Sequence, residues 1–375
     1  MKKKLTKMNT IFKGIFTGSL VLTILCDTGN AQTYSESKNI VRSFPVNPET
    51  RLDISNKYGK VHVMNWKKDS VKIEVELLVK SSNLAKLEKI MDNIDIEFTG
   101  TSYYIIANTR FGNTGNNFIS DLIDLSGTII PSKNQVEINY TVMAPSGMTV
   151  NLSNKFGNIY MDDMKGEVTV SLSNGDIKIN KLDGQADINI NFGNGIINSL
   201  NNAQLNLTYA DLEIRNANQL NVVSKSSKIR IEKVGILKIE SGRDKYSISE
   251  SNNLYGESYF SDLQIFKLNN EADFTLRYGD FTIDTVADRF SYINLHSEYA
   301  DIDLSFSREA SYFLQVSQHP EGTLHIPDGF VDIDNSNENP AEVKFTGKIG
   351  NPASSSRVEI DAPKKCTITI NQRRP

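Results

Sequence analysis

The chain has 375 residues, of which 39% are hydrophobic and 23% are charged, and its formal net charge is −4 at pH 7. The apolar content, with 17 Phe and 14 Tyr, excludes an intrinsically disordered polymer and indicates a chain with a packed core. The acidic balance argues against nucleic acid or an anionic lipid surface as a partner.

Residues 1–31 have the features of an export signal. A basic stretch comes first, with Lys2, Lys3, Lys4, Lys7 and Lys13. The apolar run "GIFTGSLVLTILC" follows, and the small residues of "GNA" precede an expected cleavage before Gln32. Cys26 suggests an alternative, lipidation, but Leu25 occupies a position where a small residue is wanted.

The mature chain carries a net charge of about −8, because the signal contains five Lys and one Asp. No later apolar run approaches the roughly 20 residues that span a bilayer. We therefore expect an exported protein, in the periplasm or at the cell surface, with no membrane-spanning segment in the mature chain.

Residues 32–149 are expected to form an N-terminal cap of strands and one helix. The phrase "LDISNKYGKVHVMNW" (52–66) is followed by the alternating strand "DSVKIEVELLVKS" (69–81) and by a helix over 82–94. Asn83 or Ser82 is the expected N-cap. The predicted apolar stripe of this helix contains Leu84, Leu87, Ile90, Met91 and Ile94. Strands at 102–111 and 134–147 flank a long surface loop at 112–134.

Residues 150–310 repeat the phrase "VNLSNKFGNIYM" in degenerate form. Its copies begin at Val150, Val170, Ile188, Leu205, Leu220, Leu237, Tyr259, Phe274 and Ile293. The copies alternate apolar and polar residues around a short turn, as β-strands do. The predicted fold is an all-β, single-stranded parallel β-solenoid of about nine coils of roughly 18 residues.

Turn residues recur within these copies. Gly157, Gly175, Gly193 and Gly279 are expected to adopt a positive φ. Aromatic residues precede Gly or Ala at one repeat position, namely Tyr58, Phe156, Phe192, Tyr209, Tyr278 and Tyr299. Stacked repeats would bring these rings into a row. The favoured interpretation is that the row packs the solenoid's own edge; the alternative is an exposed row that holds sugar rings or a partner strand.

Four Asp residues also recur at one repeat position: Asp176, Asp211, Asp280 and Asp301. Such a surface ladder of carboxylates has two interpretations, a Ca²⁺ or catalytic site and ordinary turn chemistry in which Asp accepts local backbone hydrogen bonds. The glycine-rich nonapeptide of calcium-binding β-rolls is absent from the sequence. Turn chemistry is therefore favoured.

Residues 311–375 are expected to supply the last strands, which close the solenoid. They contain "AEVKFTGKIG" and "RVEIDAPKKCTITI". Cys366 is the only Cys left after signal cleavage, so the mature chain cannot form an internal disulfide.

No pattern in the sequence predicts an enzyme, a metal site or a cofactor. The four His residues have no metal-ligand spacing, and nucleophile, Walker and dinucleotide motifs are absent. The triplets "DSV" and "DTV" match an Asp-Ser/Thr-apolar pattern of bacterial O-glycosylation, which makes Ser70 and Thr285 candidate acceptors.

The "SNKYG" and "SNKFGN" phrases, the "NGD" and "YGD" turns and the strand-rich tail resemble the bacterial adhesin-like family called toastrack domains. That family is of unknown function and is related to the auto-transporter adhesin head (GIN) domains. The resemblance covers about residues 38–372. It implies an exported single-stranded β-solenoid without established catalytic residues, often encoded near extracytoplasmic sigma factors and their regulators.

The expected function is therefore a non-enzymatic, adhesin-like binding or scaffold module of the cell envelope, whose partner is an envelope protein or a glycan. One alternative is a regulatory partner of a sigma/anti-sigma system that senses envelope stress. A second alternative is a carbohydrate-active enzyme built on a β-helix, which would need an acid and a base gathered in one groove.

Overall fold

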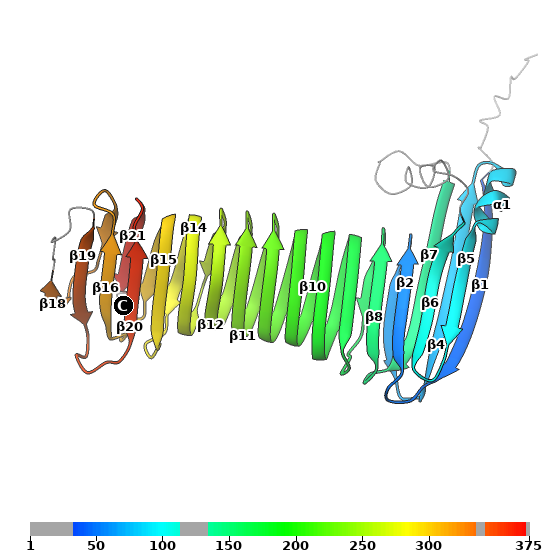
Figure 1. The fold of residues 1–375 in the computed structure, drawn as a ribbon, viewed down its shortest axis with the longest axis horizontal. Coiled ribbons are helices and arrows are strands. Elements are labelled where there is room, and N and C mark those ends of the chain that lie inside the picture. Colours follow the sequence, from blue (N-terminus) through cyan, green and yellow to red (C-terminus); the bar gives the residue numbers. More distant parts are fainter. Residues whose placement is uncertain (1–32, 113–133, 335–341, 373–375) are drawn as a thin grey trace, which may run out of the picture.

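The computed structural model describes residues 33–112, 134–334 and 342–372. The predicted export signal with Cys26 and most of the predicted loop at 112–134 lie outside these residues. Within them the chain is mostly β with one helix, as predicted, and its strands form one open sheet of an elongated body (Figure 1).

The N-terminal part contains the helix and the antiparallel strands. Its elements are β1 (Tyr34–Pro45), β2 (Arg51–Lys57), β3 (Val61–Trp66), β4 (Ser70–Ser81), α1 (Leu84–Asp92), β5 (Ile94–Gly100), β6 (Tyr104–Phe111) and β7 (Asn134–Pro145). β4 pairs antiparallel with both β1 and β7, and β5 pairs antiparallel with β6. These strands and α1 occupy one end of the body (Figure 1).

The two most similar phrases of the sequence lie side by side although 98 residues separate them. β2 pairs in parallel with β8, so that Leu52 lies opposite Val150 and Lys57 opposite Lys155. β3 likewise pairs in parallel with β9. Residues 67–148 are therefore an excursion of the chain between two neighbouring parallel segments.

The central part consists of parallel strands. They are β8 (Thr149–Lys155), β9 (Ile159–Met161), β10 (Val168–Lys225), β11 (Lys228–Gly242), β12 (Lys245–Tyr259), β13 (Asp262–Ile265), β14 (Leu268–Val286) and β15 (Tyr292–Phe306). Successive segments pair at chain offsets of 17 to 21 residues, as in Leu220 with Leu237 and Ala272 with Ile293.

The core is built from columns of aliphatic side chains that run along the body. One column consists of residues that are paired on neighbouring strands from β10 to β20. All its members are fully buried: Leu220, Leu237, Leu254, Ala272, Ile293 and Val358. Burying such side chains contributes roughly 1.5–3 kcal/mol each, which supplies the main stabilisation of the body.

The predicted repeat starts do not all belong to one column. Val150 pairs with Val168, and Val170 pairs with Leu152, so these two predicted starts are offset by two residues. Tyr259 is not a start, because it is exposed at the body's edge. A slip of two residues keeps every side chain on the same face of a strand, so the alternating pattern could not exclude it.

The C-terminal part lies at the other end of the body (Figure 1). Its strands are β16 (Tyr312–Gln318), β17 (Thr323–His325), β18 (Val331–Asp334), β19 (Val343–Ile349), β20 (Arg357–Ala362) and β21 (Thr367–Gln372). β20 and β21 pair in parallel with β15, whereas β19 pairs antiparallel with β16 and β18. Antiparallel pairing thus occurs at this end of the body as well.

Helix α1 begins where the sequence predicts. The Asn83 side chain accepts a hydrogen bond from the backbone N–H of Lys86, so Asn83 and not Ser82 is the N-cap. Leu87 and Ile90 are buried, but Leu84 is 49% exposed and does not belong to the apolar stripe.

Substituting Asn83 by Ala is expected to lower the free energy of unfolding by about 1 kcal/mol, because an amide N–H in the first turn loses its acceptor. Hydrogen exchange at the amides of α1 measures the effect. Ser82→Ala is the matched control and should leave exchange unchanged. Equal effects of the two variants would contradict the assignment of the cap.

Candidate functional site

A line of residues with positive φ runs along one edge of the body, and we call it the corner row. Its φ values lie between 51° and 65°, and its members are Tyr58, Phe156, Asn174, Phe192, Tyr209, Ser226, Arg243, Phe260, Tyr278 and Tyr299. Residues other than Gly are uncommon in this region of φ. Their recurrence shows that the chain turns in the same way in each repeat.

The residue after each corner lies close to the backbone of the preceding repeat. A Cβ atom added at Gly157 would meet the carbonyl oxygen of Gly59 at 1.8 Å, and one at Gly175 would meet that of Gly157 at 2.1 Å. This approach explains why Gly, Ala or Ser occupies the position in nearly every repeat.

The prediction of positive φ at the glycines is right for Gly279 and wrong for the other three. Gly279 has a φ of 99°. At Gly157, Gly175 and Gly193 the residue with positive φ is the one before the glycine, a member of the corner row. These three glycines are required by the close approach of two backbones.

The aromatic members of the corner row form stacks. Phe192 and Tyr209 have ring centroids 4.9 Å apart with an interplanar angle of 9°. Phe260, Tyr278 and Tyr299 form a second stack, with centroids 4.6 Å and 5.2 Å apart. Tyr58 stacks on Phe156 at the N-terminal end.

These stacks do not pack the body's own edge, except at the N-terminal end. Tyr58 is buried, but Phe192, Tyr209 and Tyr299 are each about half exposed. Exposed rings in a fixed row offer apolar contact area at low entropic cost. Of the two predicted interpretations, the exposed row describes most of these residues.

Sequence reasoning missed four members of the corner row: Asn174, Ser226, Arg243 and Phe260. The predicted aromatic row contains only aromatic residues that precede Gly or Ala, whereas Phe260 precedes Ser261. A signal was present nonetheless, since steps of 17 residues from Tyr209 lead to Ser226, Arg243 and Phe260.

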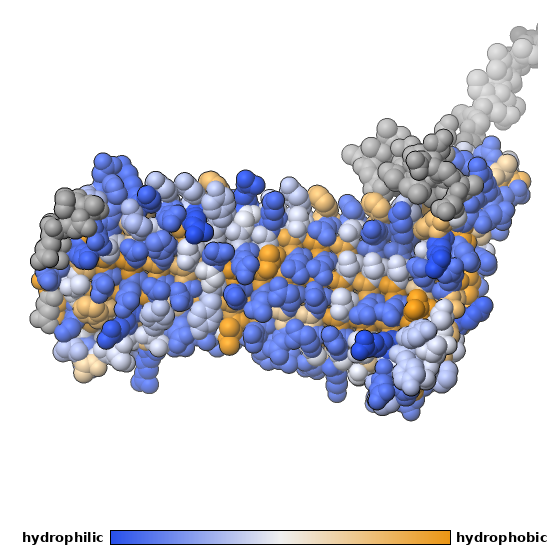
Figure 2. Space-filling model, in the orientation of Figure 1, coloured by the Kyte–Doolittle hydropathy of each residue, from blue (hydrophilic) through white to orange (hydrophobic). Residues whose placement is uncertain are grey.

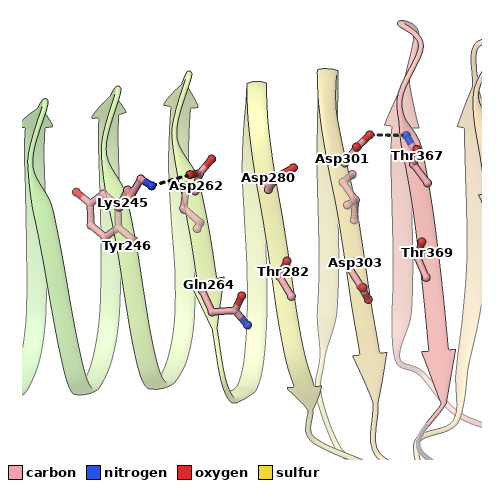
Figure 3. Close-up of a pocket in the computed structure, with 12 residues that line it drawn as sticks. Lys245, Tyr246, Asp262, Gln264, Asp280, Thr282, Asp301, Asp303, Thr367 and Thr369 are labelled. Atoms are coloured by element: carbon pink, nitrogen blue, oxygen red, sulfur yellow. Dashed lines mark hydrogen bonds and ion pairs between the residues drawn. The ribbon is translucent and has the colours of Figure 1, made fainter.

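An acidic face is formed by Asp residues that each follow a member of the corner row by two positions. Asp262, Asp280 and Asp301 stand side by side on β13, β14 and β15 (Figure 3). Lys245 lies at one end, 3.9 Å from Asp262, and at the other end the backbone N–H of Thr367 donates to Asp301 at 2.6 Å. A second row below holds Gln264, Thr282 and Asp303 (Figure 3).

The four predicted Asp residues do not form one ladder. Asp280 and Asp301 are direct neighbours in the sheet. Asp176 and Asp211 lie beyond Lys228 and Lys245, which occupy the same position in two intervening repeats. There Asp176 accepts from Asn194 at 3.1 Å, and Asp211 is paired with Arg230 at 2.6 Å. Asp262, which the sequence search missed, continues the group at Asp280.

The environment of Asp280 disfavours its charged form. Burial, followed by the charges of Asp262 and Asp301, raises the pKa of the Asp280 carboxyl above its ordinary 3.8. A raised pKa in the folded state adds stability below the ordinary pKa, and this stability is lost as the pH rises through the folded value.

Asp280→Asn is therefore expected to stabilise the protein at neutral pH, by roughly 0.2–1 kcal/mol after screening by solvent. The wild-type protein should lose stability as the pH rises from acidic to neutral, and this loss should be smaller in the variant. Denaturant midpoints measured across this range test both effects. Asp288→Asn, in the exposed turn after β14, is the control. A variant no more stable than wild type at neutral pH would contradict the argument.

Other chemistry is sparse in the described part of the chain. No group of three or more His, Cys, Asp or Glu side chains there is arranged to hold a metal ion. His296 contacts Asp361 on the neighbouring strand at 2.9 Å, an interaction between two strands of the sheet. Burial raises the pKa of the Cys366 thiol, which disfavours its reactive thiolate.

The candidate O-glycosylation acceptors lie far apart in the sequence and on different elements. Ser70 is the first residue of β4, and Thr285 lies near the end of β14. Both are partly exposed. Their modification stays a prediction.

The body carries its polar and apolar side chains in lengthwise bands. On the face drawn in Figure 2, hydrophobic side chains form a broken stripe along the long axis, with hydrophilic side chains on either side. Among residues 33–112, 134–334 and 342–372 there is no helix long and apolar enough to cross a membrane.

No protein-family model matches the sequence, and no curated protein matches it. Among solved structures it is similar to a candidate cell adhesion protein from Clostridium sporogenes, at 10% identity and a TM-score of 0.19, over 90% of this chain and 100% of the other. It is similar to a candidate adhesin from Bacteroides fragilis at 14% identity and a TM-score of 0.27, over 72% and 97%.

A third similar structure is a candidate lipid-binding protein from Parabacteroides distasonis, at 10% identity and a TM-score of 0.29, over 72% of this chain and 94% of the other. Likeness at these scores carries no argument about the role of the chain.

Proposed function

We propose that this protein is a non-enzymatic, adhesin-like binding or scaffold module of the cell envelope. In this proposal residues 1–31 export the chain, residues 32–149 form the cap, residues 150–310 form a β-solenoid of about nine coils, and residues 311–375 close it. The resemblance to toastrack domains belongs to the same proposal.

The observation that carries the proposal is the corner row. Its left-handed corners place exposed rings, and two residues later polar side chains, at the same point of successive repeats. A ligand with a repeating structure can contact several such points at once. Weak contacts then add by avidity, because each further contact is intramolecular. A glycan or an extended envelope protein has the required repetition.

Exposure of intact cells to protease, followed by detection of the protein, tests its place in the envelope. We expect degradation on intact cells and binding of the purified mature chain to cell-surface or matrix glycans. Full protection from protease would contradict the adhesin proposal. Recovery of an inner-membrane anti-sigma protein with the chain would favour the regulatory alternative.

The acidic face gives the enzymatic alternative one specific observation, since the pKa of Asp280 is raised beside Asp262 and Asp301. A glycosidase needs an acid and a base on opposite sides of the bond that is cleaved. Here the carboxylates lie in one line along a sheet face (Figure 3). Glycan cleavage that is lost in both Asp280→Asn and Asp301→Asn would establish the enzyme and overturn the binding proposal.

A further inference from the structure

The corner row is interrupted at Ser226, between two large side chains. Asp211 pairs with Lys228 and Lys228 with Lys245, so the corners Tyr209, Ser226 and Arg243 are consecutive neighbours. The stack that ends at Tyr209 therefore meets a small side chain where the next ring would lie.

The gap has the thickness of one ring. Stacked rings elsewhere in the corner row are 4.6 Å to 5.5 Å apart, which is close to one strand spacing. The corner positions of Tyr209 and Arg243 are two strand spacings apart, roughly 10 Å. The exposed fractions of two tyrosines in the row agree with an open ring face on Tyr209. Tyr209 is 53% exposed, whereas Tyr278, which has a ring on both sides, is 37% exposed.

Arg243 does not close the gap by stacking on a ring. Among residues 33–112, 134–334 and 342–372, no cation–π contact joins it to Tyr209 or Phe260. Its side chain is exposed, as are those of Lys225 and Lys228. The gap at Ser226 is thus bordered by one open aromatic face and by cationic side chains.

The charge at this point is opposite to that of the whole chain, whose net charge is −4. Lys225, Lys228 and Arg243 take part in none of the ion pairs found in the described part of the chain. The carboxylate of Asp211 is already paired with Arg230, and Glu240 lies three residues before Arg243. A local excess of positive charge favours an anionic ligand.

The backbone beneath the gap is held in place. The N–H of Ser227 donates to the Asp244 carboxylate at 2.7 Å, and Asp244 is buried. That carboxylate also accepts from Ser224 and Ser241, both at 2.7 Å. The Asp244 carboxylate thus accepts its hydrogen bonds from groups inside the body. The backbone at the gap is already ordered, so binding of a ligand costs little conformational entropy there.

We propose that the gap at Ser226 binds an acidic saccharide. One pyranose ring of the saccharide lies against the open face of Tyr209, in the place of the missing ring. Its carboxylate is directed to Lys228 and Arg243, with Lys225 beside them. This inference rests on the proposed function and specifies its ligand as a carboxylated glycan.

Ser226→Tyr tests the gap directly, because it completes the aromatic row. The substitution fits the backbone, since φ is 52° at Ser226 and 51° at Tyr209, which already holds a tyrosine. With an oligogalacturonate as probe and isothermal titration of the mature chain, we expect the affinity to fall about tenfold or more. Lys228→Gln should weaken binding several-fold and reduce its salt dependence.

Tyr103→Ala is the matched control, because Tyr103 is a tyrosine that is 67% exposed and lies outside the corner row; it should bind the oligogalacturonate as wild type does. A neutral galactan oligosaccharide should bind much more weakly to the wild type. Equal binding of the two sugars, or unchanged binding in Ser226→Tyr, would overturn the inference. So would competition by a tyrosine-containing peptide for the site.

Adhesion of Ser226→Tyr to cells or matrix separates this inference from the proposed function. If wild type and variant adhere equally and neither binds the oligogalacturonate, the acidic-saccharide site is wrong and the binding module stands. If wild type adheres to nothing, the proposed function itself falls.

Discussion

Replacing Gly175 by Ala is expected to lower the free energy of unfolding by about 3 kcal/mol. The added Cβ would lie 2.1 Å from the carbonyl oxygen of Gly157, a backbone atom held by the sheet. The neighbouring repeat cannot retreat without breaking parallel hydrogen bonds on both sides of the corner. Denaturant unfolding followed by circular dichroism measures the loss.

Gly147→Ala provides the control for Gly175→Ala. Gly147 lies in the turn between β7 and β8, and a Cβ there would meet nothing within 4 Å. It should leave stability nearly unchanged. If the two substitutions had equal effects, the close approach of successive backbones would not be the reason for the glycine.

Replacing Asp244 by Ala is expected to cost about 3–5 kcal/mol. Its buried carboxylate accepts four hydrogen bonds, from the hydroxyls of Ser224 and Ser241 and from the backbone N–H groups of Ser227 and Gly242. Alanine would leave the backbone N–H groups of Ser227 and Gly242 without this acceptor, whereas the Ser224 and Ser241 hydroxyls would keep only their contacts with Tyr246 and Ser261. Water cannot replace the carboxylate at a site that is 2% exposed without opening the corner.

Asp244→Asn separates this network from simple packing. Asparagine keeps the shape and one acceptor oxygen, and the serine hydroxyls can rotate to accept from its amide, so we expect a smaller loss. Asp288→Ala, in an exposed turn, should change stability by less than about 0.5 kcal/mol. Equal losses in Asp244→Ala and Asp244→Asn would show that the hydrogen bonds are not the source of stability.

The strands, the helix and its N-cap could be predicted because their signals are local. Alternation with a period of two defines β4 and β7, and an apolar stripe after Asn83 defines α1. The pairing of β2 with β8 also had a signal, in the shared phrase that begins at Leu52 and at Val150. That signal identifies two like segments but not the strands inserted between them.

The candidate site was predicted less completely. The sequence indicated that Asp280 and Asp301 repeat, but it placed Asp176 and Asp211 in the same ladder. Lys228 and Lys245 separate the two pairs. The predicted ladder did not include these two positions because it was defined by Asp alone. The gap at Ser226 carries no motif at all, because it is defined by a side chain that is small where its neighbours are large.

The sequence by itself determined that this chain is β-rich, that similar apolar-polar phrases recur about every 18 residues and that a helix follows Asn83, because alternation, turn residues and helix caps act over short distances. Only the tertiary structure decided which copies of the repeat are neighbours and in what register. A shift of two residues preserves every buried face, so steric contact between backbones at the corners selects among registers that the pattern leaves equivalent. That selection places Ser226 between the open face of Tyr209 and Arg243.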